Sequence, residues 1–178
     1  MRASQGGFTL IEMVTALAVL AILCTLALPS MERFSARSTR VTRQDDLVMA
    51  LHAARSAAIT QGGDTMICPS RDGEHCADGE HWEMGWLAGF DRDHDGAPDD
   101  MPFLTGQGDP QDDVVILGAT SRPRVRFHAD GSAPGSNLRL TVCTHQPGST
   151  GGAIVVANSG RIRLARARRE RLDRCRSE

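Results

Sequence analysis

The stretch Gly6-Gly7-Phe8-Thr9-Leu10-Ile11-Glu12 opens an apolar run that reaches Leu28 and stops at Pro29. A helix from Phe8 to Leu28 would be about 30 Å long, at about 1.5 Å per residue, which matches the hydrocarbon thickness of a bilayer. The run carries one charge, Glu12, and a carboxylate that faces lipid costs on the order of a few kcal/mol. We therefore expect a transmembrane helix over residues 8–28, in which Glu12 meets a partner inside an assembly.

The small residues that usually mark a signal-peptide cleavage site stand before this apolar run rather than after it. Cleavage after Gly7 would remove a short leader, residues 1–7, and leave the hydrophobic helix on the mature protein. The alternative is an ordinary membrane anchor, in which Glu12 lies near the interface and extends its carboxylate toward water.

At these residues the chain resembles the type IV pilin superfamily, whose precursors carry a G-F-T-L-I-E motif. The resemblance implies that a prepilin peptidase cuts between Gly7 and Phe8 and methylates the new amine of Phe8. It also implies an assembly role for Glu12, the fifth residue of the mature chain, which would pair with the N-terminal amine of a neighbouring subunit. Pro29 stands where such pilins often carry a helix-kinking proline.

Residues 29–61 continue the helical pattern. After Pro29 they contain no glycine or further proline, and Gly62-Gly63 follows as a helix stop. Leu47, Leu51, Ala54 and Ala58 recur at the spacing of one apolar helix face. We expect one long helix, bent or loosened at Pro29, whose second half packs on a globular part.

Beyond Gly63 the apolar pattern changes from helical to strand-like, with turn signals such as Asp72-Gly73 and Asp130-Gly131 between the runs. Arg124-Val125-Arg126-Phe127 alternates polar with apolar residues, as a half-buried antiparallel strand does. The expected fold is therefore α+β, with the N-terminal helix packed on an antiparallel β domain over residues 62–178. The expected strands are Thr65–Cys68, Gly85–Phe90, Val114–Leu117, Arg124–Phe127, Leu138–Cys143, Ala153–Ala157 and Arg161–Ala165.

Three segments of this domain, Cys68–Gly73, Gly85–Asp91 and Val125–Phe127, resemble the GspH/FimT family of minor pilins and pseudopilins. The resemblance implies a structural subunit that assembles with other major and minor pilins or pseudopilins. It would belong to a type IV pilus or, as the alternative, to a type II secretion system. It also implies a single pass through the bacterial inner membrane, with the β domain in the periplasm.

No pattern in the sequence points to catalysis. The chain lacks G-x-S-x-G, H-E-x-x-H and the glycine-rich Walker loop. Its six histidines are scattered, without the spacing of a metal site or a catalytic triad. We therefore expect a structural or binding protein rather than an enzyme.

Four cysteines lie outside the apolar run: Cys68, Cys76, Cys143 and Cys175. An even set suggests disulfides formed in an oxidising compartment, and the sequence alone permits three connectivities. We favour Cys68 with Cys76, because these two bracket a short turn-rich loop, and this leaves Cys143 with Cys175. The alternative is a zinc site that combines Cys68 and Cys76 with His75 and His81, although its spacing differs from that of C-x2-C motifs.

The stretch Asp91-x-Asp93-x-Asp95-Gly96 has the opening of an EF-hand calcium loop, and Asp99 follows it. The twelfth position of the loop is Pro102, where the calcium site needs a bidentate glutamate. Calcium is thus the one candidate cofactor, with Asp91, Asp93, Asp95 and Asp99 as candidate ligands. A solvated acidic turn without a metal is the alternative.

Charge is segregated along the chain. Residues 64–113 contain 14 acidic side chains and only two basic ones, whereas residues 158–178 contain eight arginines and three acidic residues. In a strand, Arg161 and Arg163 would point to one face, opposite Ile162 and Leu164. Two forked guanidinium groups on one surface suit phosphate, and nucleic acid is the natural polyanion.

By resemblance, some FimT-like pilins of naturally competent bacteria bind DNA through a C-terminal G-R-x-R motif, which Gly160–Arg163 matches. This resemblance predicts a site for extracellular double-stranded DNA, used in natural transformation. The alternative is that these arginines pair with the acidic segment 64–113 of the same subunit or of a neighbour. The predicted DNA-binding residues are Gly160, Arg161, Arg163, Arg166, Arg168 and Arg169.

Overall fold

The computed structural model describes residues 9–109, 111–145 and 151–177, without the side chains of residues 26–30, 32 and 33. The chain forms two compact units, residues 1–35 and 36–178. One helix, α1 (Leu10–Gln61), contributes to both units and continues through Pro29. The predicted cleavage and methylation site, Gly7 and Phe8, lies outside the described residues.

In the first unit, Thr9 caps the start of α1. The hydroxyl of Thr9 accepts a hydrogen bond from the backbone N–H of Glu12 (3.3 Å), and its carbonyl accepts one from Met13 (3.2 Å). Thr9 at the cap and Glu12 at the third helical position form the T-x-x-E pattern of a helix start. Within the described part of the chain, no helix has both the length and the apolar character that a membrane span requires.

The second unit contains two four-stranded antiparallel sheets. The first has the order β3-β2-β1-β5, built from β1 (Thr65–Pro69), β2 (Gly85–Phe90), β3 (Leu104–Gln107) and β5 (Val125–Phe127). The second has the order β4-β6-β7-β8, built from β4 (Val114–Leu117), β6 (Leu138–Thr144), β7 (Gly152–Val156) and β8 (Ile162–Arg166). A short helix, α2 (Arg169–Ser177), follows β8. The predicted α+β architecture is confirmed.

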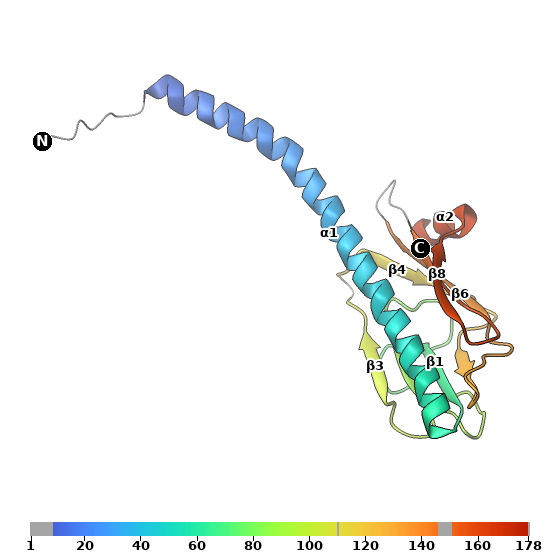
Figure 1. The fold of residues 1–178 in the computed structure, drawn as a ribbon. Coiled ribbons are helices and arrows are strands. Elements are labelled where there is room, and N and C mark those ends of the chain that lie inside the picture. Colours follow the sequence, from blue (N-terminus) through green and yellow to red (C-terminus); the bar gives the residue numbers. More distant parts are fainter. Residues whose placement is uncertain (1–8, 110, 146–150, 178) are drawn as a thin grey trace, which may run out of the picture. The chain divides into compact units, whose positions relative to one another are not determined.

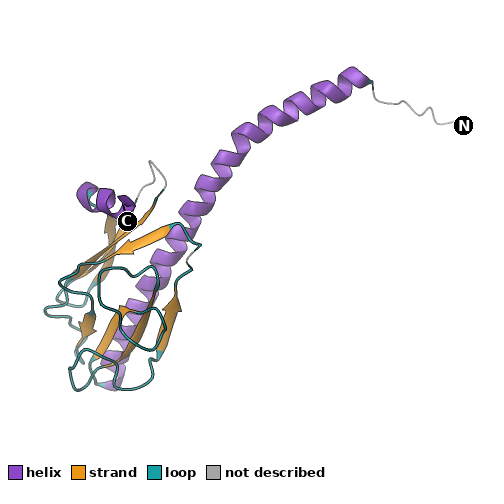
Figure 2. Ribbon diagram, turned by 180° about the vertical axis from the view of Figure 1, so that it is seen from behind, coloured by secondary structure: helices purple, strands orange, loops and turns teal. Residues whose placement is uncertain are grey.

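The C-terminal half of α1 packs against both sheets (Figures 1 and 2). Leu47 and Leu51 are fully buried in one cluster that also contains Phe127 of the first sheet and Leu140 of the second. Burying one leucine side chain contributes about 1.5–3 kcal/mol, so this helix face supplies much of the energy of the core. The helix ends at Gly62, whose left-handed conformation (φ +64°) terminates it as the sequence predicted.

A disulfide lies on the outer face of each sheet. Cys68 is joined to Cys76 and packs with Met66 and Leu87. Cys143 is joined to Cys175 of α2, in a cluster with Val115, Leu117 and Leu172. The favoured connectivity is therefore confirmed, and the second bridge anchors α2 to β6.

The zinc alternative is wrong, because both of its thiols are used in the first disulfide. Its histidines also have other partners: the ring of His75 lies 3.0 Å from Asp72, and the ring of His81 lies 2.8 Å from Glu83. Backbone N–H groups of His75 and Glu74 donate to Asp72 and hold the pKa of its carboxyl well below the usual range.

Two elements were not expected from the sequence. Strand β3, Leu-Thr-Gly-Gln, has no long apolar alternation and forms by pairing with β2, where Gly106 leaves room for the ring of Trp86. Helix α2 lies in the arginine-rich C-terminal segment, and the sequence shows no apolar helix face there because Leu172 is its only aliphatic residue. Leu172 and Cys175 lie three residues apart, on one face of the helix, and both contact the second sheet.

We predict that replacing the second bridge with serines, Cys143→Ser and Cys175→Ser, releases α2 from the sheet. The free energy of unfolding should fall by about 2–4 kcal/mol, as is typical for the loss of a disulfide. Urea unfolding measures this change, and limited proteolysis with trypsin should show faster cleavage after Arg171 and Arg174. The double change Cys68→Ser and Cys76→Ser is the control, since it should leave α2 protected. Equal cleavage within α2 in the wild type and the first variant would contradict the anchoring role.

Candidate nucleic-acid interface

The G-R-x-R segment, Gly160–Arg163, covers the end of the turn between β7 and β8 and the first two residues of β8. The N–H of Gly160 donates to the carbonyl of Ala157 (2.8 Å), and the N–H of Ala157 donates to the carbonyl of Arg161 (3.0 Å). Gly160 has φ +72°, and a Cβ at this position would overlap the carbonyl oxygen of Gly131. Only glycine fits this turn without strain, so Gly160 acts by shaping the entry to β8 rather than by offering a side chain.

The arginines of β8 are divided between two faces of the second sheet. Ile162 packs against the core cluster, so it lies on the face toward α1, and Leu164 and Arg166 follow it at alternate positions. Arg163 lies on the opposite face. Arg161 directly precedes β8, and its carbonyl still accepts a hydrogen bond from Ala157 after β7, so the same alternation places it on the face of Arg163. The structure thus brings Arg161 and Arg163 together and places Arg166 on the other side.

Strand pairing adds a residue that the sequence analysis did not select. Arg139 of β6 is opposite Val155 of β7, and Val155 is opposite Arg163 of β8. Directly paired residues share a face, so Arg139 lies on the same face as Arg163. The alternation of Arg139-Leu140-Thr141-Val142 already placed this arginine on an outer face. Only the strand order aligns it, across β7, with an arginine 24 positions later.

Part of the C-terminal arginine run has internal partners. Arg174 forms an ion pair with Glu80 of the acidic segment, and Arg171 donates to the carbonyl of Gly118. Arg176 lies 4.0 Å from Asp173. For Arg174, the alternative that the C-terminal arginines pair with the acidic segment 64–113 is therefore correct.

The predicted DNA-binding arginines, unlike Arg174, have no acidic partner within the subunit as far as it is described. They are Arg161, Arg163, Arg166, Arg168 and Arg169. Across residues 9–109, 111–145 and 151–177, no carboxylate lies within ion-pairing distance of any of these five arginines, and all five side chains are exposed.

Acidic residues of the segment 64–113 are neutralised by arginines from other parts of the chain. Asp112 lies 2.5 Å from Arg43 of α1, and Asp91 lies 2.5 Å from Arg126 of β5. These contacts leave the exposed arginines near β8 as an area of uncompensated positive charge.

The predicted calcium loop is only partly assembled. One carboxylate oxygen from each of Asp91, Asp93 and Asp99 lies within 4.8 Å of the others. Asp95 is not in this group, and its carboxylate accepts a hydrogen bond from the N–H of Ala97 (2.7 Å). Asp91 is fully buried and already holds Arg126, with Nε at 3.0 Å. A cation at this position would therefore share Asp91 with a guanidinium group.

Calcium binding stays a prediction, and the contact between Asp91 and Arg126 limits the affinity that we expect. Because Arg126 already neutralises Asp91, we expect an affinity no tighter than about millimolar, which is in the range of weak extracellular calcium modules. Calorimetry on the full chain in a non-ionic detergent should detect this binding, and Asp93→Asn should abolish it. The exposed Asp78→Asn serves as a control. Absence of binding heat at millimolar calcium would show that the loop is an acidic turn only.

Glu12, the predicted assembly residue, lies in the first turn of α1 with its side chain exposed. Apolar side chains beside it on the helix are exposed as well, among them Ile11 (67%) and Val14 (52%). Thr15, Ala16, Val19 and Leu20 line a shallow hollow with Glu12 along the helix. The carboxylate of Glu12 therefore lies among exposed apolar side chains at the start of α1.

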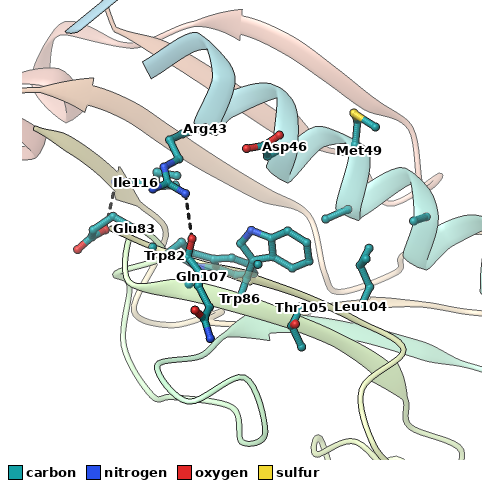
Figure 3. A pocket seen from close by; sticks show the side chains of 15 residues that line it. Arg43, Asp46, Met49, Trp82, Glu83, Trp86, Leu104, Thr105, Gln107 and Ile116 are labelled. Carbon is teal, nitrogen blue, oxygen red and sulfur yellow. Dashed lines mark hydrogen bonds between the residues drawn. The ribbon is translucent and has the colours of Figure 1, made fainter. Parts of the chain in front are cut away.

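A groove of about 540 Å³ lies between α1 and the first sheet (Figure 3). Met49 of α1 faces Trp86 and Leu104 across it. At one end, Arg43 donates to the carbonyl of Gln107 (2.9 Å). The groove is mainly apolar and contains none of the site residues predicted from the sequence.

Two family models match the chain. The model described as type II transport protein GspH matches residues 44–160, which is more than half of the chain. The model described as prokaryotic N-terminal methylation motif matches residues 2–28. The first match covers most of the globular unit, and the second covers the predicted leader and apolar run.

Individual relatives point in the same direction. Two fimbrial proteins of Pseudomonas aeruginosa are 42% identical over 59 residues, or 33% of this chain. The match spans 38% of the length of these curated relatives. The GspH model describes a transport protein and the curated relatives are fimbrial proteins, which agrees with the expectation of a structural protein rather than an enzyme.

Solved structures share the fold. Two crystal structures of the type IV minor pilin FimU of Pseudomonas aeruginosa PAO1 superpose with TM-scores of 0.60 and 0.53, each at 20% identity. They cover 74% and 68% of this chain, and 92% and 88% of the FimU chains.

Proposed function

This chain belongs to the GspH family of type II transport proteins, and on that basis we propose that it is a minor pilin or pseudopilin. It acts as a structural subunit that assembles with other pilins or pseudopilins into a filament. The observation that supports this most is the joining of two features in one chain: an N-terminal methylation motif on an exposed apolar helix, and a globular unit with a pilin fold.

The N-terminal segment would supply both anchor and assembly contact. In this proposal, a prepilin peptidase cuts after Gly7 and methylates Phe8, and residues 8–28 hold the subunit in the inner membrane with the β domain in the periplasm. The exposed apolar side chains of α1 then pack against the helices of neighbouring subunits. The carboxylate of Glu12 pairs with the N-terminal amine of a neighbour, since an unpaired charge on an apolar helix surface is costly in lipid.

Glu12 also occupies the third position of the helix cap, so its replacement must separate charge from capping. Glutamine is as suitable as glutamate at this cap position, so Glu12→Gln removes the charge and keeps the helix start. We predict that both Glu12→Ala and Glu12→Gln leave leader cleavage intact and impair entry into filaments. Immunoblots of sheared filament and membrane fractions measure both steps. Normal incorporation of Glu12→Gln would refute the charge-pairing role.

We further propose that the subunit belongs to a type IV pilus and binds extracellular double-stranded DNA for natural transformation. The support comes from the exposed arginines near β8, which have no carboxylate partner in the described ranges. Arginine forks suit phosphate oxygens, and contacts to the DNA backbone carry little sequence preference. The second candidate function is that of a type II secretion pseudopilin, which works in protein export without binding DNA. The description of the matching family, type II transport protein GspH, favours this candidate.

A DNA mobility shift with the full chain in a non-ionic detergent separates these two functions. We predict binding that weakens linearly with the logarithm of salt concentration. The double change Arg161→Ala and Arg163→Ala should remove most of the affinity and lower the salt slope by about 2, one for each lost phosphate contact. Arg71→Ala with Arg92→Ala is the matched control, because it removes the same charge from the acidic segment. No binding at low salt would favour the secretion role.

A further inference from the structure

Two arginines from different strands lie on the outer face of the second sheet, and a third precedes the helix that packs on that face. Arg139 and Arg163 are aligned across Val155. Arg168 directly precedes α2, and its charge acts on Arg139 together with that of Arg163. In addition, Nη1 of Arg139 donates to the carbonyl of Arg166 (3.4 Å), which ties β6 to the end of β8.

The electrostatics of this group are unfavourable without an anion. Burial lowers the pKa of the Arg139 guanidinium, and the neighbouring charges of Arg168 and Arg163 lower it further. Among the described residues, no carboxylate forms an ion pair with any of the three. Glu170 is the acidic residue of the first turn of α2, and it too makes no such pair. The cluster thus repels itself and would gain from a bound anion.

We propose that Arg139, Arg163 and Arg168 form one binding site for the phosphodiester backbone of duplex DNA. Arg139 is then a phosphate-binding residue outside the C-terminal arginine run. The inference rests on the DNA binding proposed above and adds a residue and a face to it. Arg166 is not part of this site, because its side chain lies on the face toward α1.

The side chains on the outer face of the second sheet suit the phosphate backbone of DNA rather than its bases. Neighbouring strands are about 4.8 Å apart, so the backbones of β6 and β8, with β7 between them, are about 10 Å apart. Arginine side chains that project from these two strands can therefore reach separate phosphates. The side chains between and beside them are Val155, Thr141 and Ala165, so this part of the face carries no aromatic ring. Single-stranded nucleic acid is usually held by aromatic stacking. The site therefore suits duplex DNA of any sequence.

Fluorescence anisotropy with a 30-base-pair DNA and the full chain in a non-ionic detergent tests the site. Arg139→Ala should weaken binding about tenfold at low salt and lower the salt slope by about 1, as the loss of one phosphate contact does. Arg166→Ala removes the same charge from the opposite face and should change the affinity much less. The duplex should bind more tightly than a single strand with the same number of phosphates. Urea unfolding of each variant checks the fold, and Arg139→Gln replaces Arg139→Ala if the latter is unstable.

The outcomes separate the two proposals. If the wild type does not bind DNA, the proposed function fails and this site fails with it. If Arg161→Ala with Arg163→Ala abolishes binding but Arg139→Ala and Arg139→Gln have no effect, the function stands and the site is wrong. Equal losses for Arg139→Ala and Arg166→Ala would likewise overturn the site, because they would show a general charge effect. Tighter binding of the single strand would overturn the preference for duplex.

Discussion

The apolar face of α1 is the contact on which the second unit depends. Leu47, Leu51 and their neighbours pack against strands of two sheets that have separate strand orders, so this helix face joins both sheets into one core. Thr65 reinforces the contact, since its hydroxyl donates to the carbonyl of Ala54 (2.9 Å). Each sheet therefore has one face committed to the helix, and only the outer faces and edges remain for other contacts.

The outer faces are covered to different extents. The first sheet carries the loop closed by Cys68 and Cys76, and the second carries α2, held through Cys143 and Cys175. Helix α2 contacts β6 and β4, which places it at one side of the second sheet. Arg139 and Arg163 lie on the same outer face, farther along β6 and β8. Arg168 directly precedes α2, so the anchoring of α2 to β6 also restrains this residue.

Charge pairing within the subunit decides which arginines stay available. Arg43, Arg126 and Arg174 each neutralise an acidic residue of the segment 64–113. The fold of a GspH-family subunit is compatible with a pilus and with a secretion system, so it does not choose between them. The exposed surface is what distinguishes the pilus role from the secretion role. The exposed arginines near β8 have no carboxylate partner among the described residues, and their guanidinium groups suit phosphate better than an apolar protein surface.

Local patterns in the sequence determined the long helix, its stop at Gly62, most of the strands and the short disulfide loop, because helical periodicity, strand alternation and turn residues act over a few positions. They missed β3 and α2, whose own residues bury little and which form by pairing with β2 or by a disulfide to β6. The basic site shows the same division. The motif Gly160–Arg163 is visible in the chain, and the alternation of side chains along β8 places Arg166 on the other face. The position of Arg139 relative to Arg163 depends on strand order and register. Those are set by burial of the core across distant segments, which no local pattern encodes.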